Sequence, residues 1–97
     1  MRVLILSIVA GLLAAPALTA EESKNASCAV QAGIVDGAAQ MRRDGRSEAR
    51  TTRALTKAVE ERYQPAVPHL VAWVYTLEKD ALELEIGEAY AEQCLNH

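Results

Sequence analysis

The stretch SCAVQAGIVDGAAQMRRDG, residues 27–45, predicts the first helix of an all-α protein. On a helix from Cys28 to Arg43, small and apolar side chains lie on one face and polar side chains on the other. Ser27 is a suitable N-cap, and Gly45 is a suitable residue to end the helix. The apolar face comprises Cys28, Ala32, Ile34, Val35, Ala38 and Ala39, and the polar face comprises Asp36, Gln40 and Arg43.

Two further helices are predicted downstream of Gly45. The second begins after Ser47, a favourable N-cap, and runs to about Tyr63. Pro65 and Pro68 interrupt backbone hydrogen bonding, and Pro68 suits the first turn of a third helix that runs to Leu77.

The spacing of Asp80 and Glu83 is that of a capping box, which predicts a fourth helix from there to about Leu95. The alternation of Leu82, Leu84 and Ile86 is also typical of a strand. A helix is preferred because no second strand candidate exists to pair with this segment.

The only two cysteines, Cys28 and Cys94, lie near the two ends of the helical region. In an up-and-down bundle of four helices, the first helix begins and the fourth ends at the same pole, so the two cysteines meet. We therefore predict a small four-helix up-and-down bundle closed by one disulfide. The alternatives are two free thiols, or a covalent dimer through one of them.

Residues Met1–Ala20 have the pattern of a cleaved signal peptide, with a basic start at Arg2, an apolar run and small residues at Ala17 and Ala20. The run is too short to span a membrane comfortably. Residues 21–97 then form a single helical domain, which we expect in the periplasm or secreted, without a transmembrane segment. These compartments are oxidising, which favours the disulfide.

The charge of residues 21–97 argues against a general nucleic-acid binder. Nine basic and thirteen acidic side chains give a net charge of −4. The charges are segregated, because residues 42–57 contain six basic and two acidic side chains, whereas residues 78–97 contain six acidic side chains and one lysine. This separation predicts two faces of opposite charge.

Four basic residues of the second helix lie on one side of a helical wheel, opposite Leu55. The simplest interpretation is a solvated outer face; the functional one is a docking strip for an acidic partner, a lipid head group or an envelope polyanion. A matching acidic row lies on the fourth helix, and the two rows could pair across a homodimer interface. The basic stripe comprises Arg46, Arg50, Arg53 and Lys57, and the acidic row comprises Glu85, Glu88 and Glu92, preceded by Glu78 or its neighbourhood.

The segment from Tyr63 to Leu77 contains no Asp, Glu, Lys or Arg. A small domain has difficulty burying a helix that is apolar nearly all round, so part of this surface is expected to contact a partner. We expect Trp73 to anchor the core and Tyr75 to lie at its edge. The candidate interaction surface comprises Val67, Val71, Trp73 and Tyr75, together with the basic stripe.

No residue pattern predicts catalysis or a cofactor. His69 and His97 have no cysteine or carboxylate at metal-ligand spacing around them, so no metal site is predicted. Glu60 and Glu61 are adjacent and diverge on a helix, so they do not form a catalytic pair. We therefore do not expect an enzyme.

The layout of Cys28, an alanine-rich helix, Tyr63 followed by Pro65, the Trp73–Leu77 segment and Cys94 resembles short, uncharacterised periplasmic helical proteins of proteobacteria. Such proteins have no assigned chemistry, so the resemblance implies no activity. Two characterised groups have a similar size and disulfide: acid-stress periplasmic chaperones, and helical immunity proteins that neutralise secreted cell-wall toxins. The chaperones have Trp-Thr before the first cysteine, whereas this chain has Ala26 and Ser27.

These observations favour a non-catalytic, exported protein-binding module of the immunity, inhibitor or small-chaperone type. The partner is another protein or a second copy of the chain. The alternative is a structural envelope protein that contacts anionic surfaces through the basic stripe.

Overall fold

The structure, a computed structural model, describes residues 19–97. This part of the chain contains four α-helices, two 3₁₀ helices and no strand, and a disulfide joins Cys28 to Cys94. The predicted all-α class and the disulfide are confirmed. The predicted signal peptide, residues 1–20, lies outside the described residues except for Thr19 and Ala20.

Helix α2 (Ala20–Arg43) begins well before the predicted start at Cys28. The hydroxyl of Thr19 accepts a hydrogen bond from the backbone of Glu22, and the Glu22 carboxylate accepts one from the backbone of Thr19. This reciprocal cap satisfies two N–H groups that a helix start leaves free. Ser27 consequently lies inside the helix, and its predicted role as N-cap is wrong.

The end of α2 follows the prediction. Gly45 has a φ of +84°, a backbone conformation that glycine adopts without steric cost. The N–H groups of Gly45 and Arg46 donate to the carbonyls of Arg42 and Met41, which completes a Schellman cap.

Helix α3 (Glu48–Ala58) begins at the predicted cap, Ser47, but ends earlier than the predicted Tyr63. The chain becomes extended at Val59, whose side chain packs against the core. The side-chain amide of Gln64 donates to the carbonyl of Thr56, one of the groups left free at the end of the helix. A 3₁₀ helix, η1 (Glu61–Ala66), occupies the rest of the predicted helix.

Helix α4 (Val67–Thr76) agrees with the prediction to within one residue at each end, with Pro68 in its first turn. The predicted fourth helix is wrong in its first part, because residues 79–83 form a 3₁₀ helix, η2 (Lys79–Glu83), without a side-chain cap. Helix α5 (Ile86–Leu95) begins after extended backbone at Leu84.

Leu82, Leu84 and Ile86 alternate between buried and exposed positions, although no strand forms here. Leu82 and Ile86 lie in the core, whereas Leu84 between them is 68% exposed. Leu82 and Ile86 are four residues apart and would also share one face of a continuous helix, so their burial alone does not select the break between η2 and α5.

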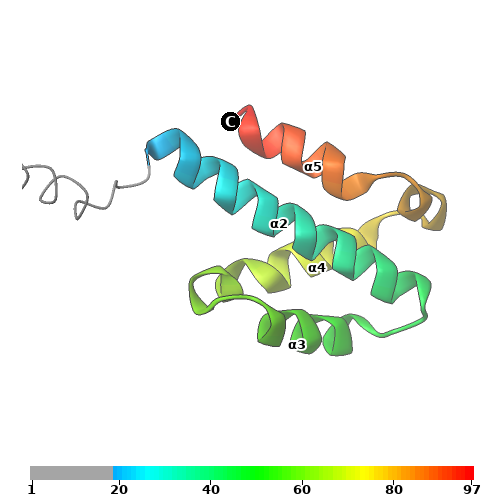
Figure 1. Cartoon of the computed structure of the whole chain (residues 1–97). Coiled ribbons are helices and arrows are strands. Elements are labelled where there is room, and N and C mark those ends of the chain that lie inside the picture. Colours follow the sequence, from blue (N-terminus) through cyan, green and yellow to red (C-terminus); the bar gives the residue numbers. More distant parts are fainter. Residues whose placement is uncertain (1–18) are drawn as a thin grey trace, which may run out of the picture.

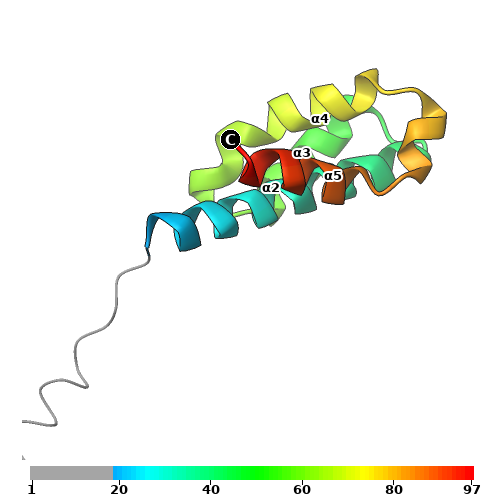
Figure 2. The ribbon, with the colours of Figure 1, turned by 90° about the horizontal axis from the view of Figure 1, so that it is seen from above.

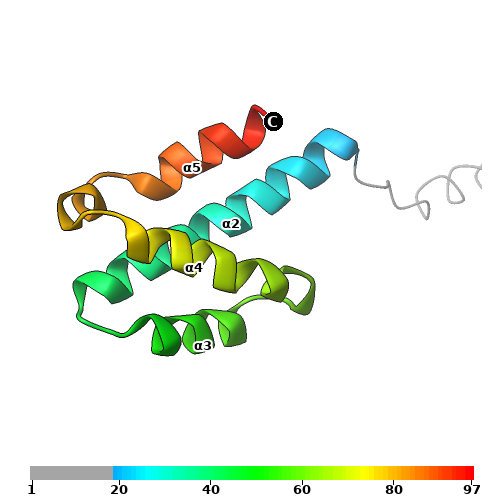
Figure 3. The ribbon, with the colours of Figure 1, turned by 180° about the vertical axis from the view of Figure 1, so that it is seen from behind.

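Helix α2 is the central element of the fold, because it packs against α3, α4 and α5. Successive helices run in alternating directions, with α2 between α5 on one side and α4 and α3 on the other (Figures 1 and 3). Seen from above, α2 and α4 lie on opposite sides of the molecule (Figure 2). The core comprises Ile34, Val35, Ala38, Ala39, Leu55, Val67, Leu70, Val71, Val74, Leu82 and Ile86.

Candidate functional site

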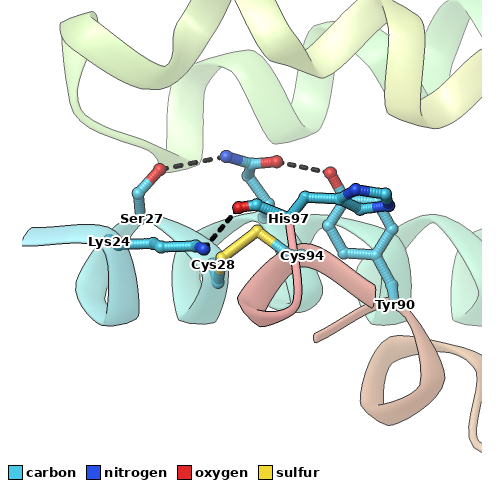
Figure 4. Close-up of a disulfide and its surroundings, with 7 residues drawn as sticks. Lys24, Ser27, Cys28, Tyr90, Cys94 and His97 are labelled. Atoms are coloured by element: carbon cyan, nitrogen blue, oxygen red, sulfur yellow. Dashed lines mark hydrogen bonds between the residues drawn. A yellow bond between two sulfur atoms is a disulfide. The ribbon is translucent and has the colours of Figure 1, made fainter. Parts of the chain in front are cut away.

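The disulfide attaches the end of α5 to the first half of α2. Cys28 is buried and Cys94 is half-buried, and their Cα atoms are 5.7 Å apart. Hydrogen bonds on both sides of the disulfide also join α2 to the end of the chain (Figure 4). Lys24 Nζ donates to the His97 carbonyl at 2.6 Å.

A chain of side-chain hydrogen bonds runs beside the disulfide (Figure 4). The Tyr90 hydroxyl donates to Gln31 Oε1, and Gln31 Nε2 donates to Ser27 Oγ over 3.0 Å. These bonds hold the ring of Tyr90 in one orientation beside α2. The end of α5 is therefore positioned by one covalent bond and several polar contacts.

The beginning of α5 is also held by α2. Asp36 Oδ1 accepts a hydrogen bond from the backbone N–H of Gly87, at 3.1 Å. Asp36 thus does for α5 what an N-cap residue does for its own helix, and its negative charge is favourable at the positive end of the helix dipole. A Cβ atom on residue 87 would lie 2.2 Å from this oxygen, so only glycine fits here without movement of Asp36.

A groove opens between α4 and α5, because both helices pack on α2 while their backbones have few close approaches to one another. Its volume is about 540 Å³. The rings of Trp73 and Tyr90 line it, with centroids 6.1 Å apart. We call this surface the α4–α5 groove; it is lined by Leu70, Trp73, Ala89, Tyr90, Gln93, Cys94 and His97.

Trp73 is the large apolar residue that the α4–α5 groove exposes most, at 41%. The expectation that Trp73 anchors the core is therefore wrong. An indole that is half covered by its own protein has apolar area left for a partner, which is why tryptophan is frequent among the residues that dominate binding interfaces.

The other three residues of the predicted apolar surface, Val67, Val71 and Tyr75, are buried or half-buried. Val67 and Val71 are completely buried and belong to the core, so their predicted role in an interaction surface is wrong. Tyr75 is half-buried, with Arg42 Cζ 5.6 Å from its ring centroid. Its hydroxyl donates to the carbonyl of Arg46 and accepts from Thr51, so it is already engaged within the protein.

The basic stripe lies on α3 and on the loop before it, and all four of its side chains are exposed. None of them is within 4.0 Å of an acidic group in residues 19–97, where Arg62 and Glu60 form the single ion pair. Arg46, Arg50, Arg53 and Lys57 therefore remain available to an anionic partner.

Glu88 and Glu92 of the acidic row lie on α5 and Glu85 is the residue before it, and all three are exposed. The pKa of Glu88 is raised above its ordinary value of 4.5. The main cause is the Glu85 carboxyl, through a hydrogen bond and through like-charge repulsion, and Glu92 adds to the repulsion.

A second, more polar depression lies beside η2, between α2 and the beginning of α5. Its one basic residue is Arg43, whose guanidinium donates to the carbonyl of Leu82 and to Gln40 Oε1. These bonds hold η2 against α2. The guanidinium of Arg43 is thus used to hold the fold together and is not free to bind a ligand in this depression. The α4–α5 groove is therefore the stronger candidate site.

No group of three or more His, Cys, Asp and Glu side chains in residues 19–97 is arranged to hold a metal ion. No helix in the same range combines the length and the apolar character that a membrane crossing needs.

Comparison with known proteins identifies no relative. No family model, no curated protein and no solved structure matches the chain. The predicted resemblance to periplasmic proteobacterial proteins therefore stays a prediction.

The interaction surface predicted from the sequence includes no residue of α5, although α5 forms one wall of the α4–α5 groove. Ala89, Tyr90 and Gln93 line the groove with Trp73 because α4 and α5 both pack on α2, to which the disulfide and the Asp36 hydrogen bond attach α5. One signal in the sequence points to Tyr90, which lies four residues before Cys94 and so shares its helix face.

Proposed function

We propose that this chain is an exported, non-catalytic protein-binding module, built as a small up-and-down bundle, whose recognition surface is the α4–α5 groove. The single observation that carries the proposal is the 41% exposure of Trp73 over an apolar groove next to a disulfide. Large aromatic side chains in concave apolar surfaces are typical anchors of protein interfaces.

The rigidity of the groove supports the proposal. One wall, α4, is held through Arg42, which donates to the carbonyls of Val74 and Leu77 at its end. The other wall, α5, is held at its beginning by Asp36 and at its end by the disulfide. A preformed surface loses little conformational entropy when a partner binds, which favours affinity.

A pair of alanine variants tests the proposal. Trp73→Ala removes the anchor, and Leu84→Ala is the matched control, because Leu84 is 68% exposed and lies outside the groove. Proteins captured from an extract of the exported fraction should be lost with Trp73→Ala and retained with Leu84→Ala. If both variants capture the same proteins as the wild type, the groove is not the recognition surface.

The second candidate function is attachment to anionic envelope surfaces through the basic stripe. It is favoured by the four exposed cationic side chains, none of which has an acidic partner in residues 19–97. Exposed cations near a negative membrane surface contribute about 1 kcal/mol each. Flotation with anionic vesicles, and not with zwitterionic ones, would support this role, and its persistence in an Arg50→Glu, Arg53→Glu variant would contradict it.

A further inference from the structure

The two ends of the described chain meet at one pole of the bundle, which has almost no core of its own. We call it the terminal pole and define it as residues 20–33 and residues 88–97. Its only buried side chain is that of Cys28, whereas every residue of the core lies between Ile34 and Ile86. Val30 and Tyr90 pack against the core and stay partly exposed. The disulfide therefore occupies the place that an apolar cluster has in the rest of the bundle.

Helix α5 has little besides the disulfide to keep its last two turns on α2. It lies at one edge of the bundle, opposite α3, and packs mainly on α2 (Figures 1 and 3). At the terminal pole, the other attachments are hydrogen bonds from Lys24 to the His97 carbonyl and from Tyr90 to Gln31. Such bonds contribute little at a surface, because water competes for the same groups. A helix of ten residues is also not stable on its own in water.

The beginning of α5 is attached independently of the disulfide. Ile86 lies in the core, and Asp36 accepts a hydrogen bond from the backbone N–H of Gly87. The guanidinium of Arg43 holds η2 through the carbonyl of Leu82. The terminal pole can therefore open while these contacts, and the core beside them, stay in place.

We propose that the disulfide is a redox switch for the α4–α5 groove. When the bond is reduced, residues 88–97 leave α2, and the groove loses the wall to which Tyr90, Gln93 and Cys94 belong. Helices α3 and α4, and α2 from Ile34 onward, remain folded around the core.

The inference rests on the proposed function and adds the regulation of its site. An exported chain is reduced before export and meets an oxidising compartment afterwards. The recognition surface therefore forms only where the disulfide forms, and the chain does not bind a partner through the groove before export.

The bond is open to attack from the groove. Cys94 lines the groove and is half-buried, whereas Cys28 is only 2% exposed. One thiolate of an external dithiol bonds to Sγ of Cys94, the bond between the cysteines breaks, and Cys28 leaves as a thiolate that takes up a proton. The second thiol of the reagent then displaces Cys94, which is also protonated. The dithiol becomes a disulfide, and the chain gains two electrons and two protons.

Amide hydrogen exchange of the purified protein, with and without dithiothreitol, tests the switch. In the oxidised protein, residues 91–96 of the chain end and residues 71–76 of α4 should both be protected. In the reduced protein, residues 91–96 should exchange within about tenfold of the rate of an unstructured peptide, whereas residues 71–76 should stay at least about a hundredfold slower.

Fluorescence of the single tryptophan reports on the groove itself. The ring centroid of Tyr90 lies 6.1 Å from that of Trp73 in the closed structure. Departure of this ring exposes the indole to water, so reduction should shift the Trp73 emission to longer wavelength.

Two variants separate the covalent link from other effects. Cys28→Ala, Cys94→Ala should resemble the reduced protein in exchange and emission, and dithiothreitol should change neither. Tyr75→Phe keeps the disulfide and removes a hydrogen bond between α3 and α4 instead. Its residues 91–96 should stay protected until dithiothreitol is added.

Equal protection of residues 91–96 and 71–76 in the reduced protein would overturn the switch. Loss of protection in both segments would also overturn it, because the disulfide would then hold the whole domain together. Unchanged Trp73 emission after reduction would show that the groove survives, and would overturn the inference as well. None of these measurements includes a partner, so each of these results leaves the groove as the proposed recognition surface. If Trp73→Ala captures the same proteins as the wild type, the proposed function fails, and hydrogen exchange still decides the switch.

Discussion

The hydroxyl of Tyr75 on α4 lies 2.7 Å from Oγ1 of Thr51 on α3, and the same hydroxyl donates to the carbonyl of Arg46. Because the single proton of Tyr75 is used on Arg46, Thr51 is the donor to Tyr75. Thr51 is completely buried, and the Tyr75 hydroxyl supplies the hydrogen-bond partner that its hydroxyl needs away from water. The contact joins α3 to α4 and explains why Tyr75 is unavailable to a partner.

Tyr75→Phe should destabilise the protein by about 1–3 kcal/mol, because it leaves the buried Thr51 hydroxyl and a backbone carbonyl without partners. Tyr63→Phe is the matched control, since Tyr63 is also half-buried and its ring, not its hydroxyl, makes its contact with Arg62. Chemical denaturation measures both variants. Equal stability of the two would contradict the structural role of the Thr51–Tyr75 contact.

Loss of the disulfide should lower the free energy of unfolding by about 2–5 kcal/mol, because the bond closes a long loop and restricts the unfolded chain. The cysteines are separated by 66 positions in the sequence. The double variant Cys28→Ser, Cys94→Ser is compared with the wild type by denaturation. Thiol titration of the unfolded, unreduced protein should find no free thiol, and two free thiols per chain would refute the bond in solution.

Gly87→Ala should lower stability by about 1 kcal/mol, because the new methyl group displaces the Asp36 carboxylate from the beginning of α5. Gly33→Ala should instead raise stability by about 0.5–1 kcal/mol, since a Cβ atom there meets nothing within 4 Å. Thermal denaturation distinguishes the two signs. The penalty at Gly87 should vanish in an Asp36→Ala background; a penalty that persists there would assign it to another contact.

Reversal of the basic stripe by Arg50→Glu, Arg53→Glu should leave helical content and Tm nearly unchanged, because both side chains are exposed and unpaired. Arg42→Gln should cost about 1.5–3 kcal/mol, because the Arg42 guanidinium donates to the carbonyls of Val74 and Leu77. Circular dichroism and thermal melts compare the variants. Unfolding of the double variant would show that the stripe is structural and would remove the basis of the envelope-binding candidate.

The raised pKa of Glu88 predicts a pH-dependent effect of its neighbour. A carboxyl whose pKa is higher in the folded state than in the unfolded state favours folding when protonated, so the repulsion with Glu85 lowers stability above the ordinary pKa of 4.5. Glu88→Gln should therefore stabilise the protein at neutral pH, and the gain should disappear as the pH falls through this range. NMR titration should also show the Glu88 pKa returning toward 4.5 in Glu85→Gln.

The positions of Trp73 and Tyr75 show where prediction of the site from sequence ends. At about 100° per residue, the two side chains lie at similar angles on opposite sides of the core face of α4. A helical wheel therefore cannot decide which of them is covered. The neighbours decide it: Tyr75 faces α3 and finds Thr51, whereas Trp73 faces the open side toward α5.

Local patterns in the sequence determined the helical class, the end of α2 at Gly45, the start of α3 at Ser47 and the bounds of α4, because periodicity, caps and proline act within a few residues. The tertiary structure alone decided where α5 begins and which face stays open. Arg43 and Asp36, both on α2, bind backbone groups of Leu82 and Gly87, and these bonds stabilise the break between η2 and α5. Donors and acceptors so distant in the chain satisfy one another only after the helices pack, so no local spacing encodes them.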